Sequence, residues 1–111
     1  MLNWNEYHSE LMNRIGELSE LSPDTVKGYG TLSAAGGKTN RLDPKTRELI
    51  AIAVAVTTRC DGCIAVHSKR ALAAGAGREE ISEALGVAVA LNAGAALVYS
   101  ARVMDALGAE A

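Results

Sequence analysis

Residues 60–67 read Cys-Asp-Gly-Cys-Ile-Ala-Val-His and contain both cysteines of the chain and one of its two histidines. The spacing of the three side chains is C-x2-C-x3-H. Because residues three or four positions apart lie on one face of a helix, Cys60, Cys63 and His67 can share a face. Two thiols beside an imidazole are suited to thiol–disulfide chemistry. They could also be three of the four ligands of a zinc site.

Before this stretch, apolar residues at helical spacing over residues 3–21 predict an amphipathic first helix. Ser22-Pro23 and Asp43-Pro44 each place a capping side chain before a proline, which predicts the starts of a second and a third helix. The second helix is expected to end around Gly36-Gly37, followed by a polar loop over residues 37–41.

The third helix is expected to continue through the run from Glu48 to Val56. Because this run is apolar on every face after Glu48, we expect it to be buried all round, in a core or between subunits. The C-x-x-C pair then opens a fourth helix, which Gly75 is expected to end. A fifth helix begins after Gly77.

Residues 92–94, Asn-Ala-Gly, predict a break, with a last helix over about residues 95–107. The expected fold is therefore all-α, with about six helices and the C-x-x-C at the start of the fourth. The stretch 84–101 is strongly apolar, but Asn92 and Gly94 interrupt it, so we interpret it as two packed helices and not as a membrane span. Its apolar surface exceeds what one small chain can hide, which predicts a homo-oligomer.

The chain has 111 residues, which suits a single domain over 1–111. Its net charge of −2 gives no basic surface for nucleic acid. No charged segment followed by an apolar run opens the sequence, so we expect a cytoplasmic protein. Structural disulfides are rare in the cytosol, and a close cysteine pair there is more often catalytic, redox-sensing or metal-binding.

Glu48 is the fourth candidate site residue. If the third and fourth helices form an antiparallel hairpin that turns near residues 57–58, Glu48 lies about ten residues before the turn and His67 about nine after it. The carboxylate would then face the imidazole and orient it, as in other sets of nucleophile, base and orienting group.

Glu48, Cys60, Cys63 and His67 form the pattern E-x11-C-x2-C-x3-H, between a helix start at 43–49 and the segment 74–81. This pattern resembles the alkylhydroperoxidase D-like branch of the carboxymuconolactone decarboxylase family, over about residues 40–105. The resemblance implies an alkylhydroperoxidase D-like helical fold and a thiol-dependent peroxidase acting in antioxidant defence. It also implies assembly as a hexamer or trimer.

The resemblance further implies that Cys63 attacks the peroxide and that Cys60 resolves the product as a disulfide. Glu48 and His67 would form the proton relay, and no cofactor or resident metal is implied. The partners would be a hydroperoxide and a thiol or lipoyl reductant. The family's best-known peroxidases have a histidine directly before the second cysteine, where this chain has Gly62.

Two other interpretations stay open. One is a metal-binding or redox-sensing helical module without turnover, in which Glu48 or His8 would complete a zinc site; His8 is otherwise expected to be an exposed helical residue. The other is a carboxymuconolactone decarboxylase-type lyase, although that reaction has no need of a dithiol.

Overall fold

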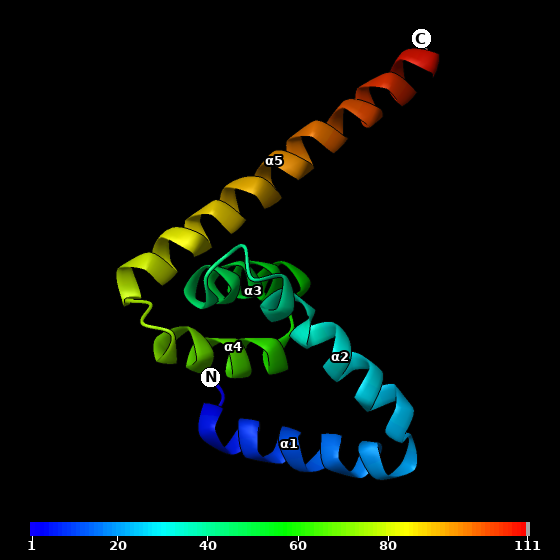
Figure 1. The fold of residues 1–111 in the computed structure, drawn as a ribbon. Coiled ribbons are helices and arrows are strands. Elements are labelled where there is room, and N and C mark those ends of the chain that lie inside the picture. The colour runs from blue at the N-terminus through cyan, green and yellow to red at the C-terminus, as the bar shows by residue number, and fades with distance from the viewer. Residues whose placement is uncertain (111) are drawn as a thin grey trace.

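The computed structural model describes residues 1–110 and contains five α-helices and no strand in that range (Figure 1). The expected all-α fold is confirmed, and so is the position of the C-x-x-C at the start of the fourth helix. The helices, in chain order, are α1 (Trp4–Leu21), α2 (Pro23–Thr39), α3 (Pro44–Thr58), α4 (Asp61–Ala73) and α5 (Arg78–Glu110).

Short polar side chains fix the helix starts. The side-chain oxygen of Asn3 accepts a hydrogen bond from the Glu6 N–H at 3.1 Å, and that of Asp43 accepts one from the Thr46 N–H at 2.7 Å. The end predicted for α2 was too early by two to three residues, since α2 continues to Thr39. It stops where Asn40 adopts a left-handed conformation with φ of 51°, which asparagine tolerates.

The predicted break at residues 92–94 was also wrong, because α5 is one continuous helix of 33 residues. The side-chain amide of Asn92 donates to the Ala88 carbonyl within the helix and to Thr57 Oγ1 across to α3. These two bonds hold Asn92 in the helical conformation. Gly94 lies among alanines, whose high helix propensity offsets the roughly 1 kcal/mol that a glycine costs.

α3 and α4 form an antiparallel hairpin, and α5 packs on α3 in the same chain direction (Figure 1). A salt bridge of 2.8 Å joins Lys45 to Glu80, and a hydrogen bond of 2.9 Å joins Thr57 to Asn92. Both pairs are 35 positions apart, so the two helices stay in parallel register along the length of α3. The core beneath them is small and consists of Ile52, Ala71 and Ala76, with Leu49, Ile81 and Leu85 packed against it.

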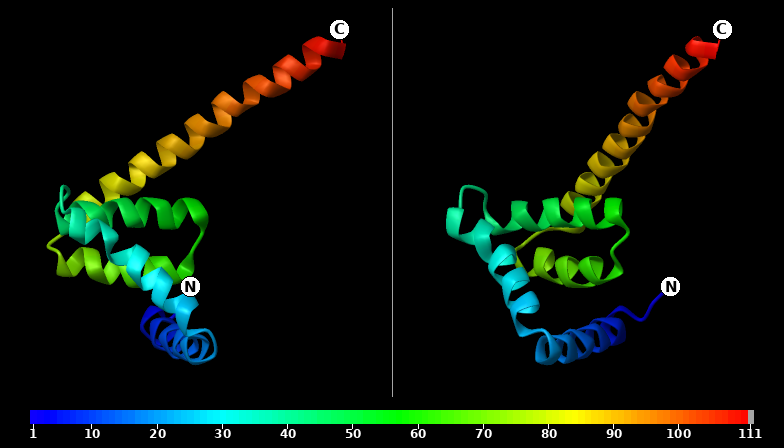
Figure 2. Two further views of the ribbon diagram at one scale, coloured as in Figure 1. Left: turned by 45° about the vertical axis from the view of Figure 1, so that its right-hand side comes forward. Right: turned by 90° about the vertical axis from the view of Figure 1, so that its right-hand side faces the viewer.

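The remaining helices are less enclosed. α1 packs against α2 and α4, while the second half of α5 extends away from every other helix, as both views of Figure 2 show. The expectation that the apolar run of α3 is buried all round does not hold within one chain. Ile52 and Ala55 are buried, but Ile50 and Val54 on the other side of α3 are about half exposed.

Candidate functional site

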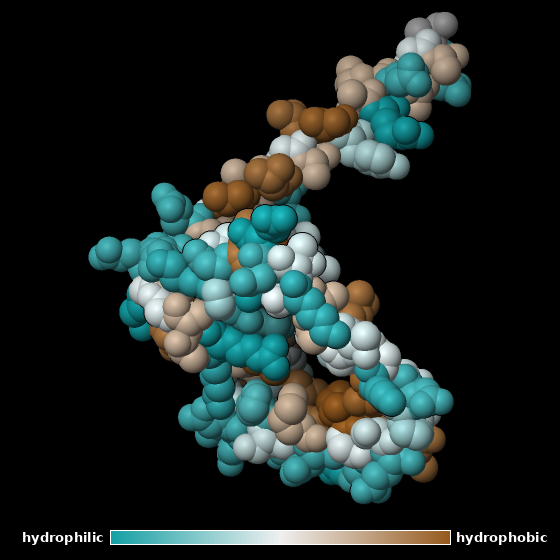
Figure 3. Space-filling view, viewed as in Figure 1, coloured by the Kyte–Doolittle hydropathy of each residue, from teal (hydrophilic) through white to brown (hydrophobic). Residues whose placement is uncertain are grey.

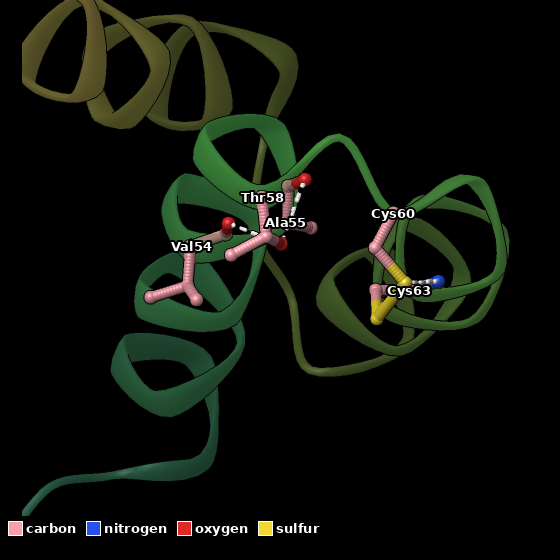
Figure 4. The surroundings of a disulfide bond; sticks show 5 residues. All are labelled: Val54, Ala55, Thr58, Cys60 and Cys63. Carbon is pink, nitrogen blue, oxygen red and sulfur yellow. Dashed lines mark hydrogen bonds between the residues drawn. A yellow bond between two sulfur atoms is a disulfide. The ribbon is translucent and has the colours of Figure 1, made fainter. Parts of the chain in front are cut away.

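The turn between α3 and α4 places the cysteine pair. Thr58 Oγ1 donates to the carbonyls of Val54 and Ala55 at 3.0 and 3.4 Å, which closes the last turn of α3 (Figure 4). Arg59 then adopts a left-handed conformation with φ of 53°. The Cys60 N–H donates to the Ala55 carbonyl at 3.0 Å, so the chain reverses within three residues and Cys60 lies directly beside the end of α3.

Cys60 is the N-cap of α4, and Cys63 lies in its first turn. The two are joined by a disulfide, with their Cα atoms 5.2 Å apart (Figure 4). The Cys63 N–H donates to Cys60 Sγ at 3.1 Å. A sulfur at a helix N-cap lies in the positive end of the helix dipole, which stabilises a thiolate. The structure shows the bonded form of the pair.

Glu48 and His67 meet across the hairpin. His67 Nδ1 lies 2.6 Å from Glu48 Oε2, and both side chains are about four-fifths buried. The ring N–H donates to the carboxylate, which leaves Nε2 as the acceptor of the imidazole. Glu48 lies beyond the first turn of α3, so this contact, and not the helix dipole, accounts for its position. His67 follows Cys63 by one turn of α4.

The first helix covers the same turn of α4. A Cβ atom added at Gly62 would lie 2.9 Å from Leu11 Cδ2 and 4.0 Å from the Tyr7 hydroxyl. Only glycine lets α1 approach this closely without displacing the Leu11 side chain. The residue directly before the second cysteine therefore lies at a packing contact with α1 in this chain.

Sequence reasoning missed the contact between α1 and the cysteine turn. The helical spacing of Trp4, Tyr7 and Leu11 was visible, but nothing in it identifies the element that these residues face. His8 was predicted to be exposed and is instead half-buried. Within residues 1–110, no group of three or more His, Cys, Asp or Glu side chains is placed so that it could hold a metal ion.

Comparisons with known proteins agree with this architecture. A family model described as the carboxymuconolactone decarboxylase family matches residues 23–106. An uncharacterized protein of Haemophilus influenzae is 47% identical over 104 residues, covering 94% of this chain and 92% of its own length. An uncharacterized protein from the cox locus of Paracoccus denitrificans is 37% identical over 93 residues, covering 84% of each chain.

A solved structure is also similar. It is the crystal structure of a carboxymuconolactone decarboxylase family protein from Legionella pneumophila in its apo form, with a TM-score of 0.76 and 35% sequence identity. The match covers 93% of this chain and 92% of that one. The likeness extends over nearly all of both chains, including the helices outside the cysteine hairpin.

Proposed function

The chain belongs to the carboxymuconolactone decarboxylase family, and on that premise we propose that it is a thiol-dependent peroxidase that reduces hydroperoxides. The observation that supports this most is the juxtaposition of two functional pairs on one hairpin. The Cys60–Cys63 disulfide lies at the start of α4, and the Glu48–His67 hydrogen bond lies one helical turn farther along it.

In the first step, the thiolate of reduced Cys63 attacks one oxygen of the hydroperoxide. An S–O bond forms, the O–O bond breaks, and the leaving alkoxide takes up a proton to become an alcohol. Cys63 is oxidised to a sulfenic acid while the peroxide is reduced by two electrons.

In the second step, Cys60 attacks the sulfenic sulfur of Cys63. An S–S bond forms and water leaves, so the thiol proton of Cys60 and the hydroxyl of the sulfenic acid depart together. The Cα separation of 5.2 Å lies within the range of ordinary disulfides, so this bond requires no large movement of the backbone.

We assign the proton transfers to His67 and Glu48. With Nδ1–H donating to Glu48, the Nε2 atom of His67 accepts the proton of the Cys63 thiol and later gives it to the leaving oxygen. Glu48 fixes the tautomer and orientation of the ring and stabilises the imidazolium that forms between these transfers.

The cycle closes when an external dithiol reduces the disulfide by thiol–disulfide exchange. A lipoyl group or a thioredoxin-like protein could supply it, or two molecules of a small thiol could take its place, and a cytoplasmic location would keep such donors available. A lyase of the decarboxylase type is disfavoured, since its reaction would leave the cysteine pair without a role.

The test is a peroxidase assay with an organic hydroperoxide and a panel of reductants: a small dithiol, dihydrolipoamide and a thioredoxin. Cys63→Ser should lower turnover by about 10³-fold or more, the scale seen when an attacking nucleophile is lost. With the reductant left out, Cys60→Ser should stop after one event, with Cys63 held as a sulfenic acid that mass spectrometry detects as one added oxygen. Full activity in Cys63→Ser would show that the roles are wrongly assigned.

The same assay separates the enzyme from a redox-sensing module. A sensor would form the Cys60–Cys63 disulfide once with peroxide but show no turnover with any reductant. Metal analysis of protein purified without chelator addresses the zinc alternative, because stoichiometric zinc together with unreactive thiols would contradict a peroxidase.

A further inference from the structure

We propose that Cys60 is the thiolate of the reduced pair at neutral pH and is held in that form by the Cys63 N–H at the start of α4. Cys63, in contrast, depends on His67 and Glu48 to lose its proton. The inference deepens the proposed function, because it assigns the ionised sulfur in the step that closes the disulfide. It rests on that function for this consequence alone, since the ionisation of Cys60 is measurable without any peroxide.

The sulfur of Cys60 takes the place of a helix-capping oxygen. Cys60 is the N-cap of α4, and its Sγ accepts a hydrogen bond from the Cys63 N–H at 3.1 Å. Cys63 is the third residue of this helix, and an N–H in the first turn has no partner within the helix. When reduction leaves a negative charge on Sγ, this bond becomes charge-assisted, which makes it roughly twice as strong as a neutral one. The bond therefore favours the thiolate over the thiol.

The starts of α1 and α3 have the same bond with oxygen in place of sulfur. The side chain of Asn3 accepts from the Glu6 N–H, and that of Asp43 accepts from the Thr46 N–H. At Asp43 the capping group can ionise, and the hydrogen bond from the Thr46 N–H is the main cause that lowers the pKa of its carboxyl from the usual 3.8. A thiol in the equivalent place has the same donor and the same helix dipole, so its pKa should lie below the ordinary value of roughly 8.5.

The charged neighbours of Cys60 largely offset one another. Arg59 and Asp61 flank it in the chain with opposite charges, and both are exposed, so salt screens them. The helices that pack against this part of the chain are α1 and α3. From α1 the neutral hydroxyl of Tyr7 reaches the turn, and from α3 the carboxylate of Glu48 is bonded to His67. The Cys63 N–H is the group that bonds directly to the Cys60 sulfur.

Cys63 depends on a different group. His67 follows it by one turn of α4, and its Nδ1–H donates to Glu48 across 2.6 Å. The Nε2 atom of the neutral ring is an acceptor, so it can take the Cys63 proton but cannot donate to a thiolate until it has done so. Ionising Cys63 therefore requires charging His67 as well, whereas ionising Cys60 charges the sulfur alone. Of the two thiols, Cys60 should lose its proton first.

This difference fixes the proton movements of the closing step. The Cys60 thiolate supplies the electron pair of the new S–S bond as it attacks the sulfenic sulfur of Cys63. The S–O bond breaks, and hydroxide leaves and takes a proton from solvent to become water. The proton that Cys60 had released to solvent balances this one, so the sum is the same as for a thiol. The closing step then needs no base, and the His67–Glu48 pair acts on Cys63 alone.

The first experiment measures the two cysteines one at a time in reduced protein. Cys63→Ala leaves only Cys60 and keeps the backbone N–H, and Cys60→Ala leaves only Cys63. The rate of alkylation by iodoacetamide is followed against pH, because exposure of the sulfur changes the limiting rate but not the pH at half of that rate. The midpoint for Cys60 should lie about 1 pH unit or more below the roughly 8.5 of a free thiol, and below the midpoint for Cys63.

The second experiment removes the donor. Cys63→Pro takes away the N–H that bonds to Cys60 Sγ, in the first turn, where proline removes no hydrogen bond of the helix itself. Cys63→Ala is the matched control, since it lacks the same thiol but keeps the N–H. The Cys60 midpoint should rise toward 8.5 in the proline variant only, with equal helicity by circular dichroism in the two proteins. An unchanged midpoint would overturn the proposal.

The third experiment leaves the start of α4 intact and therefore decides the matter even if the proline variant does not fold. Glu48→Gln is added to each single-cysteine protein. The midpoint for Cys63 should rise, because the imidazolium at His67 loses its carboxylate, and the midpoint for Cys60 should stay where it was. Equal shifts of both midpoints, or a midpoint for Cys60 at or above that for Cys63, would overturn the proposal.

The wild type gives the same comparison without substitutions. Trypsin cleaves after Arg59 and Lys69, so both cysteines lie in one peptide over residues 60–69, and its fragment ions assign each label. Limiting iodoacetamide at neutral pH should label Cys60 several-fold more than Cys63, and preferential labelling of Cys63 would contradict the proposal. A high Cys60 midpoint in an active peroxidase would overturn this inference alone, whereas a low midpoint without turnover would overturn only the proposed function.

Discussion

The α3–α4 hairpin and the outer half of α5 are both apolar helical segments, but they reach opposite states in one chain. In the hairpin, Ile52 of α3 and Ala71 of α4 are buried in the shared core, and Glu48 and His67 bond to one another across it. Figure 3 shows apolar residues on the surface of the outer half of α5, which we call the arm, and Leu97 and Val98 there stay exposed. The difference separates the part of the structure that one chain encloses from a part that it leaves exposed.

The same difference separates the candidate site from the exposed half of α5. All four residues of the candidate site lie on α3, α4 and the turn that joins them, and their contacts are made within one chain. None of them lies on α5. Substitutions in the hairpin should therefore change the stability and activity of each chain, whereas substitutions on the arm should change how chains associate.

The largest expected effect is on the hairpin core. Ile52→Ala should lower the free energy of unfolding by about 2–5 kcal/mol, because it leaves a cavity in a core that has few residues to close it. Leu97→Ala on the arm should change it by less than about 0.5 kcal/mol in dilute, monomeric protein. Urea unfolding of both variants measures the contrast.

Ile50→Ala is the matched control for that contrast, since it removes the same atoms from the exposed side of the same helix. The loss in free energy of unfolding should be small for Ile50→Ala in the monomer and should grow as the protein concentration rises. Equal costs for Ile52→Ala and Leu97→Ala under dilute conditions would contradict the division into two regions.

The next effect concerns the site. Glu48→Gln keeps the shape of the side chain but removes the charge that stabilises an imidazolium at His67, so peroxide turnover should fall by about 10- to 100-fold. The helicity should not change. Repeated in the Leu97→Glu background, the same substitution should give the same fold-change, because the two sites share no contact. A fold-change that depends on the arm would show that the two regions are coupled.

A smaller effect is expected where α1 meets α4. Gly62→Ala places a Cβ against Leu11 and should destabilise the chain by about 1 kcal/mol. In a Leu11→Ala background the clash is absent, and the same change should stabilise by up to about 1 kcal/mol through helix propensity. A double-mutant cycle by urea unfolding tests this reversal. If Gly62→Ala changes the free energy of unfolding in the same direction in both backgrounds, the close contact is refuted.

The smallest effect depends on pH. The hydrogen bond from Lys45 is the main cause that lowers the pKa of Glu80 from its usual 4.5, and the Gly77 N–H contributes. Because the folded pKa lies below the unfolded one, this stabilisation is present above pH 4.5 and is lost as the pH falls through the lowered value. Glu80→Gln should therefore melt slightly below the wild type at pH 7.

This difference in melting temperature should vanish in acid, and thermal melts at several pH values would measure it. Both side chains are exposed, so the difference should also shrink in high salt. A difference that persists in strong acid would mean that Glu80 acts through packing and not through its charge.

The sequence was informative wherever structure is set by neighbouring residues. Asp43-Pro44 predicted the start of α3, and counting from the turn predicted that Glu48 and His67 would meet. The predictions failed where a contact between residues far apart in the sequence determines the local structure. Asn92 does not break α5, because Thr57, 35 positions away, binds its side chain.

The approach of α1 to Gly62 could likewise not be predicted from the sequence, because it depends on how two helices far apart in the chain pack together. Exposure was misjudged for the same reason. The apolar run of α3 is hydrophobic on every face, but composition alone does not distinguish a face covered by the same chain from one that a second chain would cover.

The contact between Leu11 and Gly62 also bears on how this chain can diverge from its relatives. A side chain larger than hydrogen at position 62 requires the Leu11 side chain to shift, the first helix to lie farther away or position 11 to shrink. The two positions should therefore change together during evolution. Homologues with a histidine before the second cysteine should have a smaller residue at the place of Leu11 or a displaced first helix. An alignment read at these two columns would divide such proteins into two lineages, distinguished by what occupies the space above the cysteine turn.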